Sequence, residues 1–282
     1  MKRQFFIFSF LALIVVQTIF ADDQNYEDHD CEGCECLCHE LSQDWIPEPS
    51  EQVFLGPEIY HTRREKAGGT VQNGTMVGVR ATYDHIKRMG FYWGLEGSYA
   101  SGTIEGKSGR GAKIVSQLSD AEIEGRIGYT LQLRNCYRPS VTPFVGYGYF
   151  SQTNNFRAPS PVQLHFHDTF EYSTVGFLSS INFLPYLKTG INFKVKHMVN
   201  GRSKVSHDPD NESSTLIMED EDQYALDIPI TYTLCWKESD VYISLVPFFQ
   251  YRHYGGHENF PFDFIETRFY NLGARLLIGF YF

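Results

Sequence analysis

The last sixteen residues of the chain, Thr267 to Phe282, read TRFYNLGARLLIGFYF. Every second position from Tyr270 onward is apolar or aromatic, and Asn271, Gly273 and Arg275 stand between them. Successive side chains of a β-strand point to opposite faces, so the segment predicts a strand with one fully apolar face. That face comprises Tyr270, Leu272, Ala274, Leu276, Ile278, Phe280 and Phe282.

The same period of two recurs upstream in segments of about ten residues, the length of a transmembrane β-strand. Between 120 and 134, for example, Ile123 and Ile127 alternate with Glu124 and Arg126. The pattern predicts an all-β, antiparallel, up-and-down barrel of ten strands, or eight or twelve if the first segment or a loop is misread. The expected strands are 54–64, 74–86, 91–102, 120–134, 141–151, 168–181, 186–198, 223–235, 241–254 and 267–282.

The connections between these segments alternate in length, which favours a membrane barrel over a soluble sandwich. Short periplasmic turns are expected at 87–90, 135–140, 182–185 and 236–240. Long extracellular loops are expected at 65–73, 103–119, 152–167, 199–222 and 255–266. The 23 Phe, 18 Tyr and 24 Gly residues, against 5 Met, are a strand-and-turn composition.

The beginning of the chain has the pattern of a secretory signal. Lys2 and Arg3 precede an apolar run from Phe5 to Val16, and Ala21 suits a cleavage site. Removing residues 1–21 takes two positive charges and no negative ones, so the formal charge falls from −10 to −12. This acidic balance gives no reason to expect nucleic-acid binding, and no later apolar run is long enough for a spanning helix.

Residues 22–52 form an acidic, cysteine-rich segment that we interpret as a periplasmic extension and linker before a barrel at 53–282. All six cysteines fall on the periplasmic side of this topology, where oxidation makes disulfides the default. Sequence leaves the pairing open, and zinc binding with His39 is the alternative to disulfides. The disulfide candidates are Cys31, Cys34, Cys36, Cys38, Cys136 and Cys235.

The end of the chain resembles the C-terminal signal of bacterial outer-membrane barrels, of the small porin-like or OmpA-like kind. Such a signal has a terminal aromatic residue, here Phe282, with hydrophobic residues at every second position before it, here Phe280, Ile278 and Leu276. The resemblance implies an outer-membrane location and recognition of this strand by the barrel-assembly machinery. The cysteine run is similar to that of chlamydia-type envelope proteins, which implies disulfide links to other cysteine-rich envelope proteins.

Charged residues on the less apolar face of the strands are expected to point into the lumen, where opposite charges should pair. A barrel of ten strands lies near the narrow end of the known range, so we expect a salt-bridged interior with at most a thin water path. The lumen-lining candidates are Arg80, Glu96, Glu122, Glu124, Arg126, Lys188, Lys194, Arg252 and Arg275.

These features favour a structural or surface-exposed envelope barrel, in contact with outer-membrane lipid and lipopolysaccharide, with no enzymatic activity and no cofactor. A narrow porin-type channel for small solutes is the first alternative. The second is an enzyme at the barrel rim, similar to omptin proteases or to lipid-modifying enzymes, for which His167, Asp168 and the pair His207-Asp208 are loose candidates. The acidic run 208–222 is expected to be a solvated loop, with divalent-cation binding as its alternative.

Overall fold

The computed structural model describes residues 51–87, 89–133, 137–161, 163–184, 186–207, 213–218, 222–236, 239–255 and 266–281. All of these residues belong to one compact unit, Trp45–Phe282. Among them, no helix is long and apolar enough to cross a membrane. The strands are β1 (Glu51–Lys66), β2 (Thr70–His85), β3 (Gly90–Lys107), β4 (Lys113–Gln132), β5 (Ser140–Arg157), β6 (His165–Leu184), β7 (Leu187–Thr189), β8 (Asn192–Ser206), β9 (Ser214–Met218), β10 (Asp222–Asp227), β11 (Ile230–Trp236), β12 (Ser239–Tyr254) and β13 (Thr267–Tyr281).

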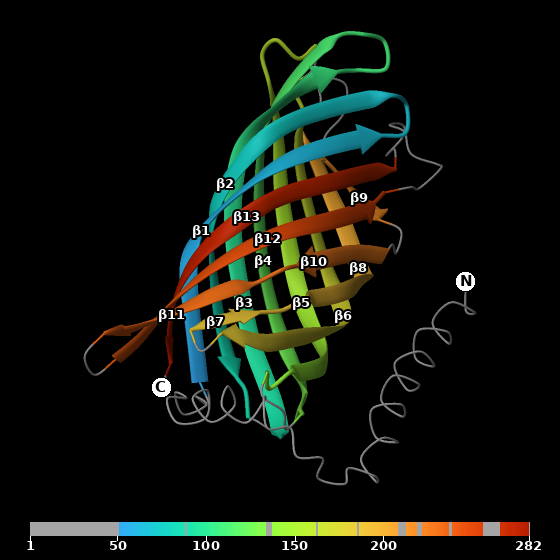
Figure 1. Cartoon of the computed structure of the whole chain (residues 1–282). Coiled ribbons are helices and arrows are strands. Elements are labelled where there is room, and N and C mark those ends of the chain that lie inside the picture. Colours follow the sequence, from blue (N-terminus) through green and yellow to red (C-terminus); the bar gives the residue numbers. More distant parts are fainter. Residues whose placement is uncertain are drawn as a thin grey trace, which may run out of the picture. The chain divides into compact units, whose positions relative to one another are not determined.

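The strands form a closed antiparallel barrel. Strands β1 to β6 pair in sequence order, and the ring continues through β8, β10, β12 and β13. The first and last strands then pair with each other, from Gln52 opposite Tyr281 to Lys66 opposite Thr267, so blue β1 lies beside red β13 (Figure 1). Closure pairs the sheet edges with each other, which a membrane barrel requires.

Several strands are pieces of one wall strand, and counting them together gives the predicted ten among the described residues. Strands β7 and β8 both pair with β6, on either side of Gly190-Ile191. Strands β9 and β10 pair with β8, and β11 pairs with β7. The break between β10 and β11 falls at Pro229, which has no N–H for the ladder. The Pro229 carbonyl still accepts a bond from the Gly190 N–H, at 3.1 Å.

The outer surface of the barrel carries an apolar belt. Side chains such as Leu55, Ile127 and Leu272 are 58, 54 and 66% exposed, a distribution opposite to that of a water-soluble barrel. Aromatic residues border the belt, including Phe91 and Trp93 near the short turns and Tyr149 toward the other end. Such a belt between aromatic girdles is the lipid-facing surface of a transmembrane barrel.

Beyond the belt the strands continue as ordered hairpins, at the end expected to be extracellular. The excursions predicted at 103–119, 152–167 and 199–222 are built mostly as strand. Their described connections shorten to 108–112 between β3 and β4 and 158–164 between β5 and β6. The first strand likewise runs from Glu51 to Lys66 rather than from 54 to 64, so it begins two residues inside the predicted linker. Periodicity marked the apolar belt and missed these extensions because most of their outward residues are polar.

Candidate functional site

The barrel interior is filled by an ion-pair lattice, and Glu96 on β3 is its centre. The Glu96 carboxylate accepts hydrogen bonds from three cations on three other strands. Arg126 Nη2 lies 2.6 Å from Oε2, and Lys194 Nζ lies 3.2 Å from Oε1. The Arg80 guanidinium also bonds to Oε1. Strand alternation places all four side chains on the inner face.

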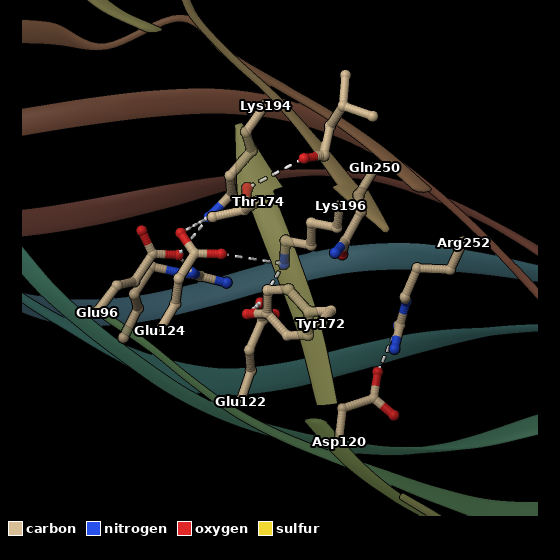
Figure 2. Close-up of polar contacts among 12 residues, drawn as sticks. Glu96, Asp120, Glu122, Glu124, Tyr172, Thr174, Lys194, Lys196, Gln250 and Arg252 are labelled. Carbon is tan, nitrogen blue, oxygen red and sulfur yellow. Dashed lines mark hydrogen bonds and ion pairs between the residues drawn. The ribbon is translucent and has the colours of Figure 1, made fainter. Parts of the chain in front are cut away.

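The lattice extends from this centre along both sides of the lumen. Lys194 Nζ also donates to Glu124 Oε1 at 2.9 Å. Lys196, two residues further along β8, donates to Glu122. Figure 2 shows Lys194 and Lys196 reaching from one strand toward Glu96, Glu122 and Glu124. On the opposite side, Arg275 Nη1 lies 2.9 Å from Asp227 and Arg80 Nε lies 2.9 Å from Glu58.

A small residue in the wall makes room for one lattice partner. The Tyr172 hydroxyl donates to Glu122, and its side chain is fully buried. A Cβ on Gly148 of the neighbouring strand would lie 2.3 Å from the Tyr172 ring, closer than atoms can approach. Glycine at 148 therefore lets the ring lie against the wall with its hydroxyl turned to Glu122.

The lattice at the level of the apolar belt is electrically neutral. Five cations are ion-paired with five carboxylates there, and each charge offsets the desolvation of its partners. Removing one member would leave the charge of its direct partner uncompensated in the interior. The members are Glu58, Arg80, Glu96, Glu122, Glu124, Arg126, Lys194, Lys196, Asp227 and Arg275.

A second polar layer lies toward the extracellular end, around Asp120. Arg252 Nη2 donates to its Oδ2 at 2.5 Å, Gln152 Nε2 donates to its Oδ1 at 2.7 Å, and the Tyr60 hydroxyl donates at 3.2 Å. The Arg252 guanidinium lies 4.7 Å from the centre of the Phe150 ring, which adds a cation–π contact to the ion pair. Figure 2 shows Arg252 and Asp120 apart from the Glu96 group.

Apolar side chains pack inside the lumen around this second layer. Phe150 and Phe170 stack with their ring centres 4.7 Å apart, and Tyr254 stacks on Phe269 at 5.5 Å. These rings belong to a cluster whose members are all less than 7% exposed, so the interior at this height is packed. The cluster comprises Tyr60, Met76, Ala100, Ile104, Leu118, Phe150, Phe170, Tyr172, Met198, Met218, Phe248, Tyr254 and Phe269.

Beyond the belt, the extracellular end holds further charges that are buried or partly buried. In β1 the outward residues change from Ile59 to His61 and Arg63, so Lys66 lies above the belt. Its Nζ sits 5.0 Å from the centre of the Phe166 ring. Burial, with the nearby Arg64 charge, lowers the pKa of Lys66 to about 7. Burial likewise raises the pKa of Asp168, whose carboxylate accepts a bond from the Ser203 hydroxyl.

A cavity of about 180 Å³ lies between the lattice and the periplasmic end of the barrel. Its floor is formed by lattice residues, namely Arg80, Glu96, Arg126, Lys194 and Arg275. Residues from the periplasmic ends of the strands, such as Gln52 and the turn residue Ile86, line the rest. We call this cavity the periplasmic cup.

The nine lumen candidates all lie on the inner face of the barrel. Eight are at least nine-tenths buried as side chains, whereas Lys188 is partly buried and lines the cup. Sequence reasoning named no lumen residue in 141–151 or 168–181 because those segments alternate poorly. It therefore missed Phe150, Phe170 and Tyr172, because aromatic residues also occupy the outer face of these strands, as Tyr147 and Tyr149 do in β5.

The described residues do not assemble the suggested rim site. His167 and Asp168 are neighbours in β6 and so project from opposite faces of the wall. His167 is exposed and its Nε2 lies 3.1 Å from the Ser151 hydroxyl, whereas Asp168 is 2% exposed and faces inward. His207 lies against His165, with ring centres 4.1 Å apart. Asp208 lies outside the described residues.

Other predicted sites fall partly outside the described chain. Cys31, Cys34, Cys36, Cys38 and Cys136 are not described, and Cys235 is described only as a backbone position of β11, opposite Asp240. The signal peptide, most of the linker, and Phe282 also lie outside. Within the expected assembly signal, Leu276, Ile278 and Phe280 are 49, 49 and 47% exposed on the outer face of β13.

Comparison with solved structures shows which proteins have a similar fold. The outer membrane protease OmpT from Escherichia coli is 13% identical with a TM-score of 0.50, over 85% of this chain and 98% of that one. The fold is that of a bacterial outer-membrane β-barrel. Together with the apolar belt, it places this protein in the outer membrane.

Two further structures align with lower scores. The translocator domain of the autotransporter NalP from Neisseria meningitidis has a TM-score of 0.45 at 7% identity, over 88% of this chain and 93% of that one. The outer membrane protein OprG from Pseudomonas aeruginosa has a TM-score of 0.39 at 7% identity, over 85% and 99%. No protein-family model and no curated protein sequence matches the chain.

Proposed function

We propose that this protein is a closed, non-enzymatic outer-membrane barrel with a structural or surface-exposed role in the envelope. The observation that carries the proposal is the filled interior. A neutral ion-pair lattice around Glu96 and a buried aromatic cluster around Phe170 occupy successive levels of the lumen. A solute would have to displace both, and each is held by contacts that a water-filled pore lacks.

The extracellular hairpins support the surface role. They extend the wall beyond the apolar belt as paired strand, as between Val71 and Lys107 of β2 and β3. Paired strands present side chains on a rigid frame, which suits contact with lipopolysaccharide or with molecules outside the cell. Periplasmic disulfides, within the chain or to cysteine-rich envelope proteins, remain part of this proposal, and non-reducing electrophoresis of envelopes tests them.

A narrow channel is the second candidate, and the periplasmic cup is the observation that favours it. The cup extends along the lumen from the periplasmic end as far as Arg80. A smaller space on the other side of Arg80 is lined by Asp120 and Arg252. Rearrangement of the Arg80 side chain would join these two spaces.

Planar-bilayer conductance of the refolded mature chain separates the two candidates, after a heat-modifiable band has confirmed folding. The closed barrel is expected to give no discrete current steps. A known porin refolded by the same protocol is the positive control. Reproducible steps from the folded protein alone would contradict the closed barrel and establish the channel.

A further inference from the structure

The periplasmic cup combines a cationic floor with apolar walls. Its lining includes five cations, Arg80, Arg126, Lys188, Lys194 and Arg275, against three acids, Asp84, Glu96 and Asp227. The lattice as a whole is neutral, but it is polarised, because three of its five carboxylates, Glu58, Glu122 and Glu124, do not line the cup, whereas four of its five cations do. The surface that meets the cup therefore carries a positive surplus.

The floor cations keep donors beyond those that the lattice uses. Lys194 spends two of its three ammonium protons on Glu96 and Glu124. Arg275 contacts Asp227 through Nη1 and Glu58 through Nε, and its Nη2 contacts no carboxylate among the described residues. Both side chains line the cup and retain a little exposure, 8% for Lys194 and 7% for Arg275. We expect an added acceptor in the cup to bind these two side chains.

Apolar and hydroxyl groups complete the cup. Phe54, Phe144, Leu178, Val246 and Leu277 contribute to its walls. The hydroxyls largely satisfy one another, as Ser140 does with Ser180 at 2.6 Å and Thr231 with Ser244 at 2.9 Å. Thus the walls offer an incoming molecule mainly apolar contact, and the floor offers charge.

We propose that the periplasmic cup binds a small organic carboxylate, with its carboxylate on the Lys194 and Arg275 side of the floor and its apolar body against Phe54 and Phe144. Small-molecule sites commonly have mainly apolar walls and a few oriented polar groups. The cavity of about 180 Å³ is smaller than the roughly 300–1,000 Å³ of drug-sized sites. Its size limits the ligand to a body such as a single ring or a short chain.

Calorimetric titration of the full mature chain, folded in detergent, tests this with three probes against a blank of detergent alone. Benzoate carries both the charge and the apolar body, benzyl alcohol carries the body alone, and inorganic phosphate carries the charge alone. Saturable binding of benzoate, with each other probe at least about tenfold weaker, is the expected result. Absence of benzoate binding overturns the proposal, and so does equal binding of either other probe.

Two neighbouring lysines supply the matched variants. Lys194→Met removes a floor cation of the cup, whereas Lys196→Met removes a lattice cation that does not line it. We expect Lys194→Met to weaken benzoate binding about tenfold and Lys196→Met to leave it unchanged. An equal loss of benzoate affinity in both folded variants would contradict the proposed site. If Lys194→Met does not fold, two other variants replace it. Lys194→Arg keeps the positive charge and should still bind benzoate. Leu178→Trp fills the cup and should lose benzoate binding.

Discussion

Glu96 is a single carboxylate that holds together cations from β2, β4 and β8. Its partners Arg80, Arg126 and Lys194 come from positions as far apart as 16, 30 and 98 residues along the chain. Opposite charges in a low-dielectric interior depend on one another, because neither can regain water when its partner is removed.

Glu96→Gln is therefore expected to lower the free energy of unfolding by about 3–5 kcal/mol, the cost of leaving buried charge uncompensated. Urea unfolding of the barrel in lipid vesicles, followed by tryptophan fluorescence, measures this. Glu105→Gln is the control on the same strand, since Glu105 is exposed and pairs with exposed Lys113 at 3.3 Å. That pair should contribute less than about 1 kcal/mol. Equal effects of the two substitutions would show that the lattice carries no special stability.

Lys66 should make the stability of the extracellular end depend on pH. Its folded pKa is about 7 because of burial and Arg64, and an unfolded lysine has a pKa of about 10.4. Between these values the unfolded chain binds more protons, so stability rises with pH from about 7 to about 10.

Lys66→Met is expected to abolish this part of the rise. The temperature of the heat-modifiable mobility shift, compared between about pH 7 and about pH 9, is the measurement. Lys113→Met, at an exposed position of β4, should keep the wild-type slope. An unchanged slope in Lys66→Met would assign the pH dependence to other groups.

At the scale of the element, each wall strand has a lipid-facing part and an extracellular part on the same outer face. Strand β4 carries Ile123, Ile127 and Tyr129 in the belt, each about half exposed, and Ser119 above it. The period of two is the same throughout, so periodicity alone does not mark where the membrane ends. The polarity of the outward residue marks that boundary.

Ile127→Lys and Ser119→Lys place the same charge at two depths of β4. A lysine at the bilayer midplane costs about 2–4 kcal/mol, and near the interface the cost falls to about 0–1 kcal/mol. We expect this difference in unfolding free energy from lipid vesicles. Equal costs at the two positions would mean that the belt is not centred on Ile127.

At the scale of the whole molecule, two different layers of side chains fill the lumen at different heights. The lattice around Glu96 lies at the level of the belt, and the aromatic cluster with Phe170 and Tyr254 lies toward the extracellular end. Opening one layer leaves the other in place.

Arg80→Ala is therefore expected to join the cup to the space beside Asp120 without creating a conducting pore. Single-channel recording of the folded variant should remain silent, because Phe150 and Phe170 stay stacked above it. Discrete current steps in Arg80→Ala would show that the aromatic layer does not seal the barrel. Such steps would also support the channel as the function of this protein.

The sequence by itself determined the barrel. Alternation in segments such as 74–86 and 267–282 specified strands and their faces, because the side-chain period of a strand is two. The inward candidates Arg80, Glu124 and Arg126 followed from the same parity. Each of these residues could be assigned to the inner face from the alternation of its own strand alone.

Only the tertiary structure decided which charges meet and whether the lumen is filled. Lys194 reaches Glu96 across the barrel, 98 residues away, and such a contact depends on strand tilt and closure rather than on local pattern. The aromatic cluster was hidden because β5 and β6 carry apolar residues on both faces. Lipid covers the outer set and the packed interior covers the inner one, so the two sets look alike in sequence.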